Sequence, residues 1–134
     1  MVWPWRKPSR LPLADRREAG RLLAQELDFL RDAPGLIVLA LPRGGVPVAY
    51  EIALSLQAPL DVLVVRKIGM PGHAEFAIGA IASIADAPGG ALQVTDRLPS
   101  DPRQLEAVQI VIRAERAELE RRTRAYRGSR PPPE

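Results

Sequence analysis

The sequence predicts an α/β fold with a parallel β-sheet, and two apolar runs joined by a helix are the main observations behind this prediction. Residues 36–41 are apolar without polar alternation, which is typical of a strand buried on both faces, as in a parallel sheet. Residues 60–65 form a second strand, after a helix over 47–56 that Pro59 ends. A strand, a helix and a strand with short links make a βαβ unit, whose crossover is right-handed in nearly all proteins.

A first helix is expected before this unit. Asp15 and Glu18 resemble a capping box, in which side chains bind the free backbone N–H groups of the first turn. The apolar residues behind this pair fall on one helical face: Ala19, Leu22, Leu23, Leu27 and Leu30. Residues 33–35 (Ala-Pro-Gly) end the helix, since proline and glycine interrupt helical structure.

After the second strand the pattern changes to an exposed loop, a hairpin and a long helix. Residues 70–75 contain proline, glycine, histidine and glutamate, and they predict the loop. Residues 76–85 and 91–95 are expected to pair as a hairpin, with two glycines in the turn between them. A helix should then run over 103–126, with apolar residues partly on one face.

The composition is that of one globular domain. The chain has 134 residues, 46% of them hydrophobic and 26% charged, and no apolar run reaches the ~18 residues of a membrane span. The domain is expected over 14–127, between an irregular arm at 1–13 and a Pro-rich tail at 128–134. The absence of cysteine excludes disulfides and thiolate metal sites, and it fits a cytoplasmic protein.

Basic residues outnumber acidic ones by 19 to 16, and most of them are arginines. Two interpretations stay open: the codon bias of a GC-rich genome, or a preference for anionic ligands, because a guanidinium fork matches phosphate oxygens. The end of the 103–126 helix is rich in arginine, but Glu115, Glu118 and Glu120 interleave with it. That pattern is typical of a solvated or helix-pairing face, so a homodimer through this helix is expected and nucleic acid is not.

The link from the first strand to its helix, Arg43-Gly44-Gly45, is a candidate anion site. The first N–H groups of a helix have no partner, and the helix dipole adds positive potential there. The two glycines are expected to allow strained backbone angles and the close approach of a phosphate. Pro47 suits the first turn, where its missing N–H costs nothing. The alternative is a plain strand-to-helix turn.

Arg66 and Lys67, directly after the second strand, are the second candidate. Neighbouring parallel strands lie about 4.8 Å apart and their carboxyl ends share one edge, so loops 42–45 and 66–69 should meet there. A diphosphate would satisfy both groups of positive charge. The alternative is a solvated basic pair at a strand end.

Other sequence motifs for ligand binding are missing. The chain has neither Gly-x-x-x-x-Gly-Lys-Ser/Thr nor Gly-x-Gly-x-x-Gly, so P-loop and dinucleotide folds have no support. His73 is the only histidine, and without His or Cys companions no metal-ligating residue is expected. Glu75 is either a catalytic or ribose-facing carboxylate or a surface acid of its loop.

At these residues the chain resembles the type I phosphoribosyltransferases, and within them the bacterial phosphoribosyltransferase-domain proteins. The matching blocks agree in order and spacing, and they are Asp15-Arg16 with Ala19-Gly20, residues 41–49, residues 65–69 and residues 75–80. The resemblance covers about residues 13–127, and it implies a parallel-sheet fold of that type.

The resemblance also implies a role for each candidate residue. The pyrophosphate of phosphoribosyl pyrophosphate (PRPP) would be held by residues of both loops: Arg43, Gly44, Gly45, Arg66 and Lys67. Residues 68–80 would form a mobile cover, with Glu75 as a catalytic residue inside it. A nitrogen nucleophile, usually a base, would displace pyrophosphate from the anomeric carbon of the ribose. Mg²⁺ would accompany the pyrophosphate through its oxygens.

One motif of the family is missing from the 134 residues. The family has a later strand that ends in two acids, followed by a Thr-Gly loop, whereas here Thr95 and Thr123 are the only threonines and neither precedes glycine. The resemblance therefore implies a fold truncated before the loop for the 5′-phosphate. Two alternatives stay open: an active phosphoribosyltransferase, and a catalytically inactive remnant or binding module of the same fold. Little activity is expected from the chain alone.

Overall fold

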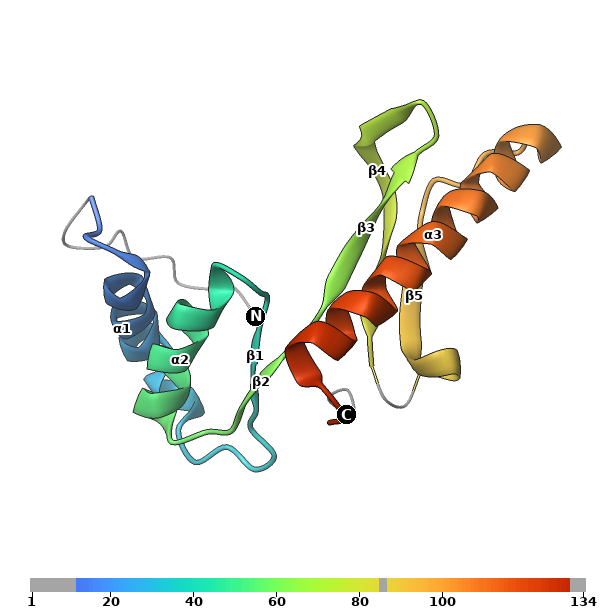
Figure 1. Cartoon of the computed structure of the whole chain (residues 1–134). Coiled ribbons are helices and arrows are strands. Elements are labelled where there is room, and N and C mark those ends of the chain that lie inside the picture. Colours follow the sequence, from blue (N-terminus) through green and yellow to red (C-terminus); the bar gives the residue numbers. More distant parts are fainter. Residues whose placement is uncertain (1–11, 85–86, 131–134) are drawn as a thin grey trace. The chain divides into compact units, whose positions relative to one another are not determined.

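A computed structural model describes residues 12–84 and 87–130 of the chain (Figure 1). Most of the predicted arm at 1–13 and residues 131–134 of the predicted tail lie outside the described residues. The chain divides into two compact units, one that ends at Asp61 and one that begins at Val62. Each unit is described by itself.

The first unit contains two helices and a small sheet. Its elements are α1 (Arg16–Glu26), the 3₁₀ helix η1 (Asp28–Leu30), β1 (Val38–Ala40), α2 (Gly45–Leu56) and β2 (Leu60–Val62), which reaches the boundary. β1 and β2 are neighbours in a two-stranded parallel sheet, and the Val38 N–H donates to the Pro59 carbonyl over 2.9 Å. The predicted βαβ order is confirmed, with strands shorter than predicted.

The first turn of α1 begins at the predicted cap. The Asp15 carboxylate accepts the Glu18 N–H at 2.8 Å, which satisfies one free donor of the first turn. The Glu18 carboxylate accepts the N–H of Ala14 rather than that of Asp15, so the second bond of the predicted capping box is shifted by one residue. These two bonds fix the turn that carries Arg16.

α1 and α2 pack closely because Gly20 faces α2. A Cβ at Gly20 would lie 2.6 Å from the Val48 carbonyl oxygen, closer than such atoms approach in proteins. Two arginines of α1 also bind Glu51 of α2, Arg17 at 3.2 Å and Arg21 at 3.6 Å. The helix pair is therefore held by a close approach at Gly20 and by a shared carboxylate.

Only one face of β1 is covered. Ala40 is 1% exposed, whereas Leu41 is 55% exposed, and Ile37 and Leu39 on the same side as Leu41 are also exposed. The prediction of burial on both faces is therefore wrong for the described chain, because α2 packs on a single face of the two-stranded sheet. The apolar run identified the strand but not its surroundings.

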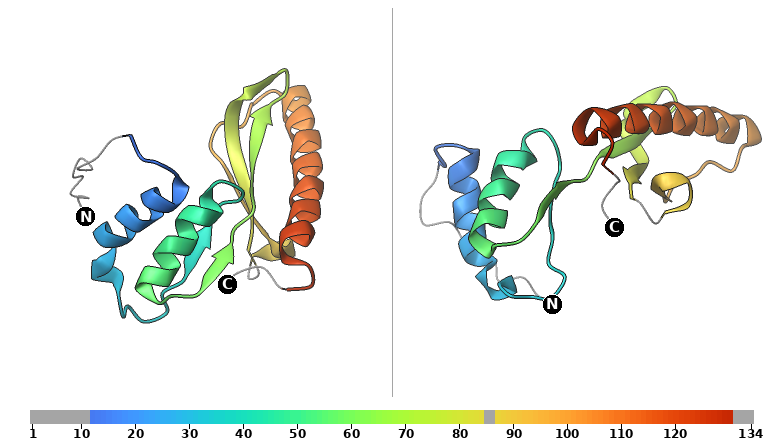
Figure 2. Two further views of the ribbon diagram at one scale, coloured as in Figure 1. Left: turned by 60° about the vertical axis from the view of Figure 1, so that its left-hand side comes forward. Right: turned by 60° about the horizontal axis from the view of Figure 1, so that its bottom comes forward.

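The second unit is an antiparallel sheet with a long helix on it. β3 (Val65–Met70), β4 (His73–Ser83) and β5 (Ala91–Thr95) lie in that order, η2 (Pro88–Gly90) links the last two, and α3 (Pro102–Arg127) follows. The predicted hairpin and the predicted long helix are thus confirmed. Figure 2 shows α3 running along the sheet. Within the described residues no helix is long and apolar enough to cross a membrane.

Two segments predicted as loops belong to the β3–β4 hairpin. Residues 66–69 lie within β3, and residues 70–75 hold the end of β3, a turn at 71–72 and the start of β4. Gly72 adopts a φ of +80°, an angle that glycine takes without steric cost and that lets the chain reverse in two residues. In place of the predicted six-residue loop there is a two-residue turn between two strands.

α3 covers one face of this sheet. The buried side chains between them are Val64, Ile68, Ile78 and Ile81 of the sheet segment and Val108 and Leu119 of α3. Arg66 is in register with Ile81, and its Nε lies 2.6 Å from Oε2 of Glu115 on α3. Near the end of α3, the buried Arg127 donates to the Val62 carbonyl over 3.2 Å. Apolar packing and two arginines hold the helix on the sheet.

The opposite face of the sheet is open within its unit. The register of the three strands places on it Val65, Lys67, Ala80, Ala82, Leu92 and Val94. Val94 is 60% exposed, and Leu92 and Lys67 are exposed as well. Arg66 and Lys67, adjacent in sequence, therefore lie on opposite faces of β3.

Replacing Glu115 by alanine should lower the free energy of unfolding by about 1–2 kcal/mol, because the Arg66 guanidinium would stay part-buried without a partner. The two side chains are 26% and 22% exposed, which places the pair between surface and core. Urea unfolding followed by circular dichroism measures the loss. Glu106→Ala is the matched control, since Glu106 is an exposed acid of the same helix. Equal losses in the two variants would contradict a role for the pair.

Glu118 should titrate at unusually low pH. Hydrogen bonds from Arg121 and Arg122 lower the pKa of its carboxyl group from 4.5 to about 2. A pKa that is lowered in the folded state means that the stabilising contact is present above pH 4.5 and is lost as the pH falls towards 2. Helix content should fall over that range by more in the parent chain than in Glu118→Gln. A carboxyl titration midpoint at or above 4.5 in NMR would contradict the contact.

Candidate anion-binding site

The link between β1 and α2 is a three-residue turn over 42–44. The Gly45 N–H donates to the Leu41 carbonyl over 3.1 Å, and the Val46 N–H donates to the Arg43 carbonyl over 3.2 Å. The peptide between Pro42 and Arg43 is cis. The turn therefore passes directly into the first turn of α2, and the Arg43 side chain is exposed at the junction.

Two backbone amides of this turn are available to an anion. Within the described ranges, the N–H groups of Arg43 and Gly44 donate to no other group. Gly45 and Val46 are bonded within the turn, which corrects the prediction that the whole first turn offers free amides. The two free N–H groups lie at the N-terminus of a 12-residue helix, whose dipole adds positive potential.

Neither glycine of the turn has a strained backbone. Gly44 has φ −63° and ψ −27°, an ordinary right-handed conformation, and Gly45 is the first residue of α2, so the predicted strained angles are wrong. A Cβ at Gly45 would meet Leu41 at 3.7 Å, an ordinary contact. A Cβ at Gly44 would lie 3.1 Å from Nε and 3.4 Å from Nη2 of Arg16. Gly44 therefore leaves space on its side-chain side, and the Arg16 guanidinium lies next to that space.

Arg16 is the residue of this site to which the sequence alone assigned no role. It lies in the first turn of α1, far from Gly44 in sequence, so no spacing pattern joins the two. The one signal was its place beside Asp15 in the block that resembles the phosphoribosyltransferases. Only the packing of α1 on α2 brings its guanidinium to the turn.

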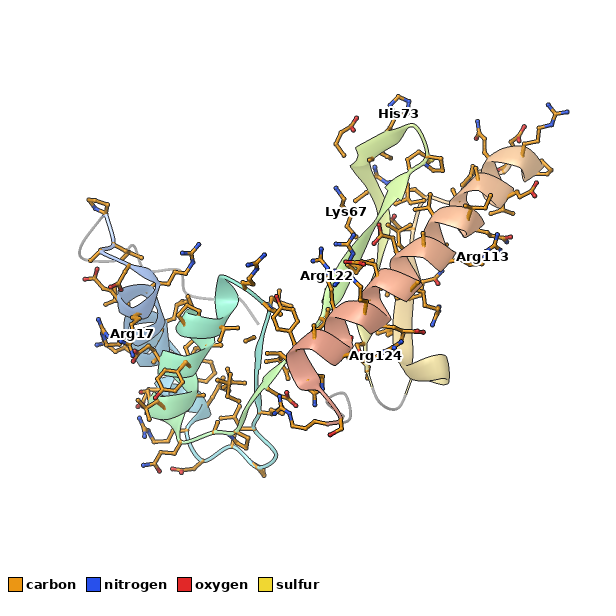
Figure 3. The ribbon with its side chains drawn as sticks, in the orientation of Figure 1. Arg17, Lys67, His73, Arg113, Arg122 and Arg124 are labelled. Carbon is orange, nitrogen blue, oxygen red and sulfur yellow. The ribbon has the colours of Figure 1, made fainter. Side chains whose placement is uncertain are left out.

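Arg66 already has an anionic partner inside the protein. Its ion pair with Glu115 engages the guanidinium in the packing of α3 on the sheet. Binding of an external anion by Arg66 would compete with that carboxylate. Lys67 points to the other face of β3 and makes no ion pair with another described residue, so its charge is free (Figure 3).

A cavity of about 410 Å³ lies within the second unit, beside the β3–β4 turn, and its volume is typical of small-ligand sites. Its lining residues come from the hairpin and α3, and they are Arg66, Lys67, Gly69, Met70, Pro71, Gly72, Ala74, Val111 and Glu115. The paired charges of Arg66 and Glu115 border this cavity, whereas the register places the Lys67 side chain on the other face of β3.

Glu75 and His73 lie near the start of β4, and both are exposed. Within the described part of the chain neither side chain makes a hydrogen bond or an ion pair. Figure 3 shows the His73 side chain near the tip of the β3–β4 hairpin. Phe76, next to Glu75, lies under the Arg97 guanidinium, 5.5 Å from ring centre to Cζ. No group of three or more His, Asp or Glu side chains among the described residues could hold a metal ion. The catalytic role of Glu75 stays a prediction.

The predicted site residues are divided between the two compact units. The first unit holds Arg43, Gly44 and Gly45, together with Arg16. The second unit holds Arg66, Lys67 and Glu75. That the two groups bind one diphosphate together stays a prediction. The β1–α2 turn lies within the first unit alone.

No family model matches the chain. The chain is 47% identical to two curated proteins of Mycobacterium tuberculosis, from strains CDC 1551 / Oshkosh and ATCC 25618 / H37Rv, each named "Putative phosphoribosyl transferase". The match extends over 116 residues, which are 87% of this chain and 25% of each relative. Among solved structures, the crystal structure of TT1426 from Thermus thermophilus has a TM-score of 0.68 and 41% identity. That match covers 90% of this chain and 55% of TT1426.

The chain thus spans a quarter of the length of these curated relatives and a little over half of the solved structure. The resemblance seen in the sequence is confirmed: over these 116 residues the chain is similar to curated proteins named as phosphoribosyl transferases.

Proposed function

We propose that this chain forms the pyrophosphate-binding part of a phosphoribosyltransferase and that PRPP is its substrate. The observation that supports this most directly is the β1–α2 turn, with two free amides at a helix N-terminus and an exposed arginine. The relatives named as phosphoribosyl transferases give that turn its substrate class. Charge and sequence relationship therefore favour the same ligand.

The turn suits a phosphate group in particular. Backbone N–H groups at a helix N-terminus bind phosphate oxygens with little reorganisation, because the helix fixes their direction. The Arg43 guanidinium adds a full positive charge and several donors, and no carboxylate among the described residues is paired with it. An anion that reaches the turn meets donors that are not already used.

In the proposed reaction a nitrogen nucleophile, such as a ring nitrogen of a base, attacks the anomeric carbon of PRPP. The C–N bond forms while the bond from that carbon to the pyrophosphate oxygen breaks, and pyrophosphate leaves with the electron pair. A proton on the nucleophile is then released to solvent or to a base. The turn stabilises the negative charge that grows on the leaving pyrophosphate. With a base as acceptor, the product is a nucleotide, which is salvage chemistry.

Mg²⁺ enters this proposal as part of the substrate. The turn itself carries amides and guanidinium groups, and the described residues contain no cluster of acids for a metal. The ion would therefore be bound by pyrophosphate oxygens and by water, which Mg²⁺ retains readily. The protein contributes donors to the phosphate rather than ligands to the metal.

The second group of candidate residues has a smaller role in the proposal. Lys67 supplies a free charge to a diphosphate, because Arg66 is engaged by Glu115. Glu75 stays a proposed catalytic carboxylate on β4. A homodimer through residues 103–126 also stays a proposal. Within that helix, Arg121 and Arg122 form ion pairs with Glu118 of the same helix.

A pyrophosphate-binding segment without turnover is the second candidate function. One sequence observation favours it: the 134 residues contain no acidic pair followed by a Thr-Gly loop. Incubation of the chain with PRPP, Mg²⁺ and a panel of bases separates the two. Base-dependent release of pyrophosphate supports the transferase, and binding of PRPP without release supports the binding segment.

Replacing Arg43 by alanine should weaken the binding of Mg²⁺-pyrophosphate about fivefold to tenfold, because one charge-assisted contact is lost while the amides remain. Isothermal titration calorimetry on the 134-residue chain measures the change. Arg113→Ala is the matched control, since Arg113 is an exposed arginine of α3 without an ion pair among the described residues (Figure 3). If Arg43→Ala binds as well as the parent chain, the turn is not the pyrophosphate site.

A further inference from the structure

Three arginines lie on the first turns of α1, and they do not share one role. Arg17 and Arg21 both point to α2, where they bind the Glu51 carboxylate at 3.2 and 3.6 Å. The Arg16 side chain makes no hydrogen bond or ion pair with any group in the described ranges. Its guanidinium lies instead against Gly44, at the turn between β1 and α2.

The backbone conformation of Gly44 does not require a glycine, whereas the contact with Arg16 limits the space for a side chain at this position. Its φ of −63° and ψ of −27° are open to any residue. The three nearest atoms to a Cβ at this position all belong to Arg16: Nε at 3.1 Å, Nη2 at 3.4 Å and Cζ at 3.6 Å. An alanine would therefore make the guanidinium shift by a few tenths of an ångström, without straining the main chain.

The position of Arg16 brings a second guanidinium to the free amides. The unbonded N–H groups of Arg43 and Gly44 lie in the same turn that Arg16 borders. Arg16 and Arg43 are both exposed, and neither is neutralised by a carboxylate among the described residues. Two arginines and two amides offer several donors, which matches the several oxygens of a diphosphate better than those of a single carboxylate.

We propose that Arg16 is a further ligand-contact residue, which donates to an oxygen of the bound pyrophosphate and which Gly44 leaves in place to do so. This inference rests on the proposed function, since it concerns the same turn. It adds a residue from α1, so that the anion joins the first helix to the β1–α2 turn. A purely structural Arg16 would fill space beside Gly44 and would leave ligand affinity unchanged when removed.

The test is calorimetric titration of the 134-residue chain with pyrophosphate and Mg²⁺. Arg16→Ala should weaken binding about tenfold, and Arg16→Lys by less, because lysine keeps the charge but lacks the planar fork. Gly44→Ala should weaken binding by less than Arg16→Ala, since it shifts the guanidinium but keeps its charge. Arg21→Ala should bind like the parent chain, because Arg21 is an exposed arginine of α1 directed to Glu51.

Thermal melts of the same variants separate binding from folding. Arg16 is exposed and unpaired within the described ranges, so Arg16→Ala should melt close to the parent chain. If the parent does not bind pyrophosphate, the proposed function fails and this inference fails with it. If the parent binds and Arg43→Ala weakens binding while Arg16→Ala and Gly44→Ala do not, the inference alone is overturned.

Discussion

The candidate site depends on the junction at which β1 becomes α2. The chain turns from strand to helix within three residues, and two hydrogen bonds, from Gly45 to Leu41 and from Val46 to Arg43, use the amides that close the turn. The N–H groups of Arg43 and Gly44 are the ones that remain. Because a helix N-terminus concentrates positive potential, the same geometry that makes the turn short also makes it attractive to a phosphate.

A second constraint separates the two basic residues of β3. Successive side chains of a strand point to opposite faces, so Arg66 lies under α3 and Lys67 lies on the open face. Glu115 then binds Arg66 and ties it to the packing of the helix. Lys67 makes no ion pair with another described residue, whereas Arg66 stabilises the second compact unit. Of these two adjacent positive charges, that of Arg66 therefore has a structural role and that of Lys67 is available to a ligand.

The sequence predicted the order of elements well, because that order rests on local patterns. The Asp15 cap, the βαβ unit, the β4–β5 hairpin and α3 all follow from capping, apolar runs and turn residues. One failure is local, since residues 66–69 and 70–75 were predicted as loops and belong to the β3–β4 hairpin. The contacts that the sequence missed are non-local. The partner of Arg66 is 49 residues away on α3, and the neighbour of Gly44 is on α1, so neither contact leaves a spacing signal. The sequence also does not show why a glycine is present. Gly72 adopts a positive φ, whereas Gly44 leaves space for the Arg16 side chain.

The most direct measurement is a ¹H–¹⁵N NMR titration of the chain with pyrophosphate and Mg²⁺. Binding at the β1–α2 junction should shift the backbone amide signals of Arg43 and Gly44 most, because their N–H groups would gain an acceptor, and the Arg16 Nε–Hε signal with them. Large shifts confined to other residues, with the Arg43 and Gly44 amides unchanged at saturation, would contradict the account.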